Sequence, residues 1–241
     1  MRDNRKIENR IENYWDKRSA EFSKVRKKEL SSENAPLWRE LILKHISPKK
    51  SLKILDIGAG AGFFTIILAK EGHEVTGIDI SEGMLKEAKA NIASYNLKAD
   101  FVKMAADRLD FPSETFDAAI SRNLTWTLPD AMEAYKEWYR VLKRGGVLLN
   151  FDSDVGKVEF TKKDEQKDVH ANISLDLVKE CNEIKASLRI STHKRPDWDI
   201  ALLKNIGFKV EFDENINSLV RKDKNLLYDN IPMFGIYGKK I

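Results

Sequence analysis

Three alternating glycines and one later carboxylate are the residues of this chain whose spacing best suits ligand chemistry. Gly58, Gly60 and Gly62 follow an apolar run that ends at Ile57, and Asp79 ends a second such run. Glycines let a backbone pass close to a ligand, and the free N–H groups at a helix start attract a carboxylate or phosphate. A carboxylate after the second strand can accept hydrogen bonds from ribose hydroxyls. This region therefore predicts a site for an adenosine-containing cofactor.

The glycine spacing separates two kinds of cofactor. A nicotinamide dinucleotide fingerprint needs glycine where this chain has Phe63, which would obstruct a pyrophosphate. The pattern of Asp56 and the three glycines instead resembles motif I of class I S-adenosylmethionine-dependent methyltransferases. Further landmarks follow in that family's order: Gly77–Ser81 with Met84 and Leu85, Ala106 and Asp107 with Phe111–Asp117, and Arg140–Gly146. The alternative is a tight turn with Asp79 capping the next helix, although Ser81 is the better N-cap.

Alternating strand and helix patterns predict an α/β fold with a doubly wound, mostly parallel sheet. The resemblance implies seven strands in the order 3-2-1-4-5-7-6, one of them antiparallel, with helices on both faces. The expected strands span Lys53–Ile57, Glu74–Ile78, Asp100–Lys103, Phe116–Ser121, Val147–Phe151, Phe208–Phe212 and Met233–Lys239. The expected core helices span Phe63–Lys70, Glu82–Asn96, Asp130–Leu142 and Trp198–Asn205.

We expect one methyltransferase domain over residues 1–241. Its parts are an N-terminal helical cap (1–47), a cofactor-binding core (48–151), a helical cover inserted after strand 5 (152–196), and the last helix with a C-terminal hairpin (197–241). Apolar residues at helical spacing from Val169 to Leu188 predict one long amphipathic helix in the cover, with Cys181 on its buried stripe. Gly145 and Gly146 are expected to end the helix before strand 5.

The resemblance implies cofactor contacts from residues at the carboxyl ends of the strands. Asp79 would accept the ribose hydroxyls, Ile80 and Met84 would enclose the adenine, and Asp107 would accept from the adenine amino group unless it is a plain turn residue. Asn123 would offer its backbone carbonyl to the methionine ammonium. The expected cofactor-binding residues are Asp56, Gly58, Ala59, Gly60, Gly62, Asp79, Ile80, Met84, Ala106, Asp107, Arg108 and Asn123.

The acceptor side of the site is less sharply defined by the sequence. The segment Arg122–Thr125 lacks both prolines of the motif in adenine- and glutamine-amino methyltransferases, and Cys181 lies in the wrong place for a cytosine-carbon nucleophile. The segment resembles the small-molecule branch that includes ubiquinone- and menaquinone-pathway enzymes. Trp126 is expected to line the acceptor pocket or to anchor its loop. Tyr14 is expected to close over the cofactor or to fill the buried stripe of its helix.

His170 and His193 lie in the expected cover, where each is either a general base or a surface or structural residue. Methyl transfer mainly needs donor and acceptor held in line, and it needs a base only where the acceptor must lose a proton early. The expected activity is S-adenosylmethionine-dependent methyl transfer to a small molecule by in-line displacement. The alternatives are an RNA or protein acceptor, or a cofactor-binding protein without turnover.

Composition narrows the class of protein. A chain of 241 residues that is 42% hydrophobic suits one α/β domain, and its single cysteine excludes an internal disulfide or a cysteine-based metal cluster, so no metal is expected. The longest apolar run is too short to span a bilayer, and the charged start lacks a signal segment, so a cytoplasmic protein is expected. The net charge of +4 is spread among interleaved acids and bases, unlike a nucleic-acid-binding face. The sequence does not indicate the oligomeric state.

Overall fold

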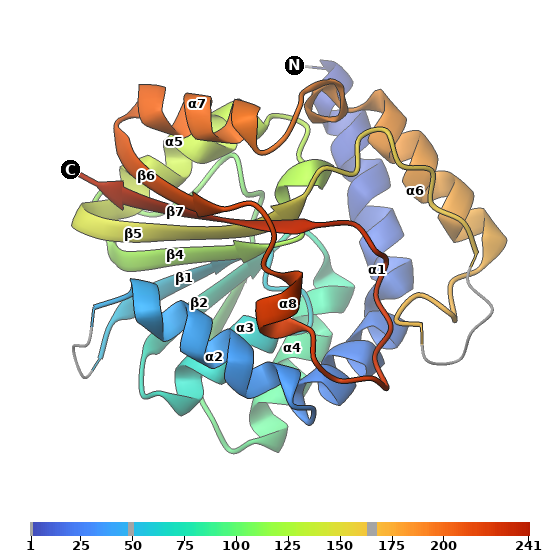
Figure 1. The fold of residues 1–241 in the computed structure, drawn as a ribbon, viewed down its shortest axis with the longest axis horizontal. Helices are drawn as coiled ribbons and strands as arrows, with labels where there is room; N and C mark the ends of the chain where they lie inside the picture. Colours follow the sequence, from blue (N-terminus) through green and yellow to red (C-terminus); the bar gives the residue numbers. More distant parts are fainter. Residues whose placement is uncertain (1, 48–50, 163–167) are drawn as a thin grey trace.

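The computed structural model describes residues 2–47, 51–162 and 168–241, and a seven-stranded sheet forms their centre (Figure 1). The strands are β1 (Lys53–Ile57), β2 (Glu74–Asp79), β3 (Asp100–Lys103), β4 (Phe116–Arg122), β5 (Leu142–Ser153), β6 (Phe208–Asp213) and β7 (Met233–Lys240). Their order is β3-β2-β1-β4-β5-β7-β6. Only β7 runs antiparallel to its neighbours β5 and β6. The predicted fold class and strand order are therefore confirmed.

Helices cover both faces of the sheet and the edge where the parallel strands end. They are α1 (Arg2–Leu30), α2 (Asn34–His45), α3 (Phe63–Lys70), α4 (Glu82–Ser94), α5 (Ala131–Val141), α6 (Leu175–Ser187), α7 (Asp197–Ile206) and the short α8 (Asn217–Val220), with two 3-10 turns, Thr125–Thr127 and Arg189–Thr192. Figure 1 shows α2 to α4 on one face, α5 and α7 on the other, and α1 crossing the carboxyl ends of the strands with α6 outside it.

Two apolar clusters, one on each face, hold these layers together. Tyr135 and Trp138 of α5 are fully buried in one cluster, and Trp38 of α2 packs edge-on against Phe64 and Phe151 in the other. The central strands β1 and β4 are buried on both faces, as parallel strands beneath two helical layers must be. The sheet is thus a rigid platform, and its carboxyl edge can carry a site.

Two predicted helix boundaries in the cover and before β5 are wrong. The helix expected from Val169 to Leu188 is only α6, because Ser174 caps its N-terminus by accepting from the Leu177 amide at 3.3 Å. Val169 instead donates its amide to the Leu227 carbonyl at 3.0 Å, so this apolar residue belongs to a loop. Cys181 is buried as predicted, at 7% exposure.

The second error concerns the glycine pair before β5. The strand begins at Leu142, where it already pairs with Phe116, and then shifts register before Val147. Gly145 and Gly146 therefore lie in the irregular start of β5 rather than after α5, which ends at Val141. The end of α5 and the first pairing of β5 fall on adjacent residues. The glycine pair alone does not indicate this, because glycines also commonly end helices.

Candidate active site

A cavity of about 520 Å³ lies at the carboxyl edge of the sheet, beneath α1. The loops that follow β1, β2 and β4 form its floor. Residues of α1, the stretches 158–161 and 169–178, and the C-terminal stretch 228–233 complete its walls. Segments distant in the sequence therefore enclose one space at the place where open α/β sheets bind ligands.

The glycine loop between β1 and α3 forms the floor of this cavity. Gly58 and Gly60 line it with φ of +67° and +52°, a conformation that side chains disfavour. A Cβ on Gly58 would come within 2.8 Å of the Leu124 side chain, and one on Gly60 within 3.2 Å of Phe22. Gly62 does not line the cavity; its missing side chain lets α3 approach Ala88 of α4.

Two carboxyl groups lie beside the glycine loop, the buried Asp56 and the partly buried Asp79. One Asp79 oxygen accepts from the Gly60 amide and the other from the Ser81 amide, each at 2.9 Å. Asp56 accepts from the Thr65 amide at 2.9 Å and its hydroxyl at 2.6 Å, which fixes the end of β1 to α3. Burial raises the pKa of Asp79 to about 6 and that of Asp56 to about 7.

The walls next to Asp79 combine apolar side chains with a third carboxylate. Ile80, Met84, Ala106 and Asp107 all line the cavity, and burial raises the pKa of Asp107. Arg108 does not reach the cavity, because its guanidinium turns to Glu8 of α1 with bonds of 2.7 and 2.9 Å. Of the predicted cofactor-binding residues, the structure places all along the cavity except Gly62 and Arg108.

Helix α1 is held over the site by polar contacts that the sequence analysis did not identify. Asp16 accepts from the Ser81 hydroxyl at 2.5 Å and the Gly83 amide at 2.9 Å, at the start of α4. Ser23 accepts from the Asn91 side-chain amide at 3.0 Å. A signal exists in the sequence, because polar residues that recur on the apolar side of an amphipathic helix need partners when they are buried.

A basic cluster occupies the cavity wall formed by α1, β4 and the C-terminal segment. Its guanidinium groups belong to Arg18, Arg26, Arg122 and Arg221, and the carboxylates beside them are Glu29 and Asp229. Arg122 also lies over the Phe63 ring, 4.3 Å from its centroid. No motif pointed to this cluster.

The remaining predicted residues fall at different places. Tyr14 lines the cavity and is also buried in the apolar core, so its position fits either expected role. Trp126 lines the cavity and packs edge-on against Phe160, with ring centroids 5.8 Å apart. His170 lines the cavity too, but His193 stacks on Trp198 outside it. Asn123 lines the cavity at φ +54°, and its amide donates to the Phe151 carbonyl at 2.8 Å.

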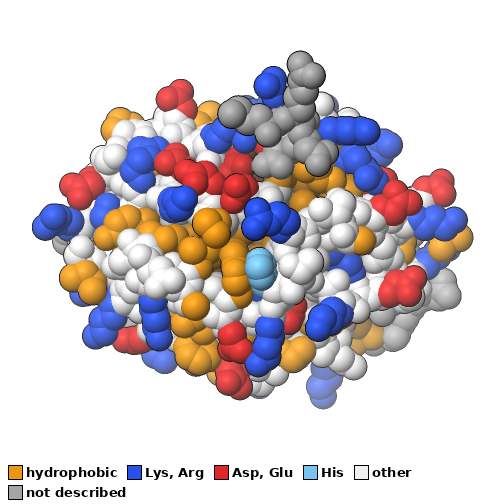
Figure 2. All heavy atoms as spheres, turned by 90° about the horizontal axis from the view of Figure 1, so that it is seen from above, with side chains coloured by type: hydrophobic (Ala, Val, Ile, Leu, Met, Phe, Trp, Pro, Cys, Tyr) orange, Lys and Arg blue, Asp and Glu red, His pale blue; other side chains and the backbone are white. Residues whose placement is uncertain are grey.

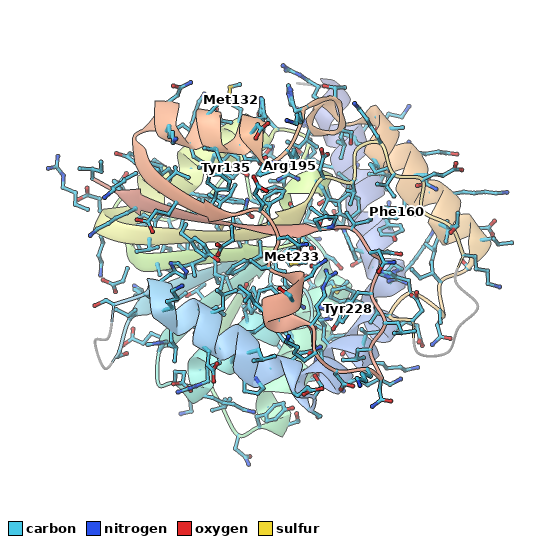
Figure 3. The ribbon with its side chains drawn as sticks, viewed as in Figure 1. Met132, Tyr135, Phe160, Arg195, Tyr228 and Met233 are labelled. Carbon is cyan, nitrogen blue, oxygen red and sulfur yellow. The ribbon has the colours of Figure 1, made fainter. Side chains whose placement is uncertain are left out.

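A buried polar network fixes the loop that carries Trp126. Arg195 donates to both carboxylate oxygens of Asp199, at 2.8 and 2.9 Å, and to Asp152 at 3.3 Å. Asp152 in turn accepts from the Trp126 amide at 3.1 Å and from the Thr125 hydroxyl. Figure 3 shows Arg195 close to Tyr135, whose hydroxyl donates to Asp199 at 2.5 Å. The network orients the cavity wall after β4.

The surface carries charges of both signs, and two kinds of feature are missing from the described residues. On the face drawn in Figure 2, basic and acidic side chains are interspersed. In the described part of the chain, no helix is long and apolar enough to cross a membrane, and no group of three or more His, Cys, Asp or Glu residues could hold a metal ion.

Comparisons with known proteins match part of this chain. The model of a family described as a methyltransferase domain matches residues 55–150. The demethylmenaquinone methyltransferase of Staphylococcus aureus (strain MRSA252) is 38% identical over 124 residues, which are 50% of this chain and 51% of that protein. The chain thus spans about half the length of the curated relatives that it matches.

Solved structures share the fold at lower identity. A putative S-adenosyl-L-methionine-dependent methyltransferase from Methanococcus maripaludis is 21% identical, with a TM-score of 0.63 over 93% of each chain. The cyclase SpnF is 16% identical, with a TM-score of 0.58 over 84% of this chain and 80% of its own. Because a protein named as a cyclase and one named as a methyltransferase share this fold, the reaction must be argued from the site.

Proposed function

We propose that this chain, which carries a class I S-adenosylmethionine-dependent methyltransferase domain, transfers the cofactor's methyl group to a small-molecule acceptor. The main support is that one cavity joins the glycine loop and Asp79 to an aromatic compartment beneath α1. A small molecule fits such a covered space, whereas an RNA or protein would need open access to the reacting atoms. The Staphylococcus relative is named for the methylation of demethylmenaquinone, which is also a small molecule.

The residues on the cavity floor fit S-adenosylmethionine. The Asp79 carboxylate has about four lone-pair sites. The Gly60 and Ser81 amides occupy one on each oxygen and the Ile80 amide also donates to this carboxylate, so acceptor capacity remains for a ribose hydroxyl. Gly58 and Gly60 leave the loop backbone open to the methionine part, and Asp107 would accept from the adenine amino group. We place the Asn123 carbonyl at the methionine ammonium. When bound, the cofactor supplies a methyl group on a sulfonium, which is already an activated leaving group.

The protein's own contribution is positioning and exclusion of water. The Asp152 network holds Trp126, and orientation of this kind can supply ~7–11 kcal/mol of the barrier. Tyr14 stays protonated, because burial raises its pKa far above neutrality, so it can donate a hydrogen bond but cannot take a proton. Desolvation lowers the pKa of His170 to about 4, which makes it a weak base, and its partly exposed ring places Nε2 3.7 Å from an Asp229 carboxylate oxygen. We therefore assign His170 to hydrogen bonding with the acceptor rather than to proton removal.

The test is a cofactor titration followed by a methyl-transfer screen. Calorimetry should show binding of S-adenosylmethionine and its demethylated product but not of NADH. Protein with a labelled methyl donor should then label small aromatic acceptors and not RNA or protein. Asp79→Ala should abolish both signals, while Asp110→Ala, an exposed carboxylate in the stretch between β3 and β4, should keep them. Labelling of RNA or protein alone would contradict the proposal.

A further inference from the structure

The basic cluster in the cavity carries more positive than negative charge. Four guanidinium groups and two carboxylates line this wall, which leaves an excess of two positive charges. The other acidic side chains that line the cavity are Glu8, Asp56, Asp79, Asp107, Asp152 and Glu159. Arg108 pairs with Glu8 and Arg195 with Asp152, while Asp56 and Asp79 accept from the glycine loop region. None of these forms an ion pair with the cluster in the described residues.

Glu29 neutralises only part of this charge, because two arginines share it. Arg26 donates to one Glu29 oxygen at 2.7 Å, and Arg122 donates to both oxygens at 3.1 and 3.0 Å. The Glu29 side chain is 1% exposed. A bidentate bond to one arginine and a further bond to a second leave this carboxylate little capacity for a third cation.

Arg18 and Arg221 are the cations that remain. Within residues 2–47, 51–162 and 168–241, neither forms an ion pair with a carboxylate, and Arg18 is 5% exposed with an unpartnered Nε. Burial lowers the pKa of both groups, and repulsion from Arg26 contributes to both shifts. Arginine nevertheless stays charged in proteins, and a buried charge without a counterion, such as Arg18, is costly. Arg221 is partly buried and donates to the Asp229 backbone carbonyl at 3.4 Å. These two guanidinium groups are thus available to bind an anion.

Their surroundings point to the acceptor rather than to the cofactor. Arg18 interacts with Tyr14 and Cys181, on the side of α1 that faces α6. Arg221 lies 4.6 Å from the centroid of Tyr228, which Figure 3 shows on the C-terminal segment before β7. Within the described structure, neither guanidinium bonds to the glycine loop or to Asp79. The adenosine end and the basic cluster are therefore separate parts of one cavity.

We propose that the acceptor carries an oxyanion, either a carboxylate or a phosphate monoester, which Arg18 and Arg221 bind through their planar N–H forks. Guanidinium groups match both oxyanions bidentately. The apolar walls at Tyr14, Trp126 and Val178 require that the rest of the acceptor be apolar or aromatic. This inference rests on the proposed function, and it sets the acceptor apart from a neutral quinone.

Direct binding to the protein saturated with S-adenosylhomocysteine tests the inference, since no turnover is then needed. The probes are benzoate, phenyl phosphate and neutral benzamide, and calorimetry measures the binding of each. Benzoate or phenyl phosphate should bind at least about tenfold tighter than benzamide, and the tighter of the two identifies the oxyanion. Arg18→Met and Arg221→Met should each weaken that binding about ten- to a hundredfold. Arg10→Met, on the same helix but paired with Glu180 at the surface, should not.

Stability separates a ligand-binding arginine from a structural one. Because Arg18 has no counterion among the described residues, Arg18→Met should leave the thermal midpoint unchanged or raise it. If Arg18→Met does not fold, Arg221→Met alone still decides the question. Equal binding of benzamide and the anions, or no anion binding at millimolar concentration, overturns the inference. So does a loss of S-adenosylhomocysteine affinity in the arginine variants, which would assign them to the cofactor's carboxylate. Failure of the wild-type protein to bind S-adenosylhomocysteine would instead refute the proposed function.

Discussion

The two ends of the cavity are built by different means. The cofactor end consists of backbone groups and short side chains from consecutive segments, β1 through α4, and its contacts are local hydrogen bonds around Asp79. The acceptor end collects long charged side chains from α1, β4 and the C-terminal segment, and Glu29 joins them. A preformed loop therefore binds one ligand, while an assembled wall binds the other. Loss of a single charge should therefore destabilise the protein more at the acceptor wall than at the cofactor end.

The largest expected effect is a loss of stability when the acceptor wall loses its shared carboxylate. Glu29→Gln leaves Arg26 and Arg122 buried without their shared carboxylate, which should lower the free energy of unfolding by about 3–5 kcal/mol. The matched control is Glu180→Gln, which breaks a surface pair with Arg10 and should cost no more than ~1 kcal/mol. Urea denaturation of both variants measures the difference. Similar small losses would show that the wall does not depend on Glu29.

The next effect concerns the loop. Gly58→Ala and Gly145→Ala both place a side chain at positive φ, +67° and +77°, which costs ~1–2 kcal/mol of strain. Only the first also pushes a Cβ to within 2.8 Å of Leu124 in the cavity wall, whereas nothing lies within 4 Å at Gly145. Gly58→Ala should therefore weaken S-adenosylmethionine binding by about tenfold or more, and Gly145→Ala should leave it unchanged. Calorimetry measures the S-adenosylmethionine affinity of both variants. Equal affinities would show that Gly58 does not contact the ligand.

The same contrast explains what the sequence could predict. The residues around Gly58 and Asp79 were predictable, because a strand, a tight loop and a helix start are consecutive and their chemistry is local. The strand order followed only from the family resemblance that these residues carry. The basic cluster was not predicted, because Arg18, Arg122 and Arg221 come together only when three distant segments fold.

A partial signal for the cluster does exist in α1. Its apolar stripe runs through Tyr14 and Phe22, and Arg18 and Arg26 occupy that same stripe at four-residue steps. Charged residues on a buried stripe indicate paired or ligand-binding groups rather than a solvated face. The errors have a related cause: apolar spacing around Val169 is helical in sequence, but Ser174 starts the helix later and leaves a loop that lines the cavity.

A pH titration sharpens the comparison from the cofactor end. Burial raises the pKa of Asp79 to about 6, so the carboxyl becomes protonated below that pH and loses acceptor capacity for ribose hydroxyls. S-adenosylmethionine affinity should thus be constant above pH 7 and fall by up to about tenfold for each unit below 6. Asp79→Asn should bind more weakly at pH 7.5 but without this dependence. A wild-type affinity that does not change between pH 5 and 7.5 would show that the Asp79 carboxylate does not bind the ribose.

The smallest effect is expected where α1 meets the cofactor end. Glu8 of α1 holds Arg108, which is 58% exposed, so the pair is worth ~0.2–1 kcal/mol and is screened by salt. Glu8→Gln should therefore reduce S-adenosylmethionine affinity no more than about fivefold, and less at high salt. Glu12→Gln, which frees Lys103 at a similar exposed pair but does not line the cavity, is the control. A hundredfold loss at Glu8 alone would mean that its carboxylate touches the ligand, and α1 would then belong to both ends of the cavity.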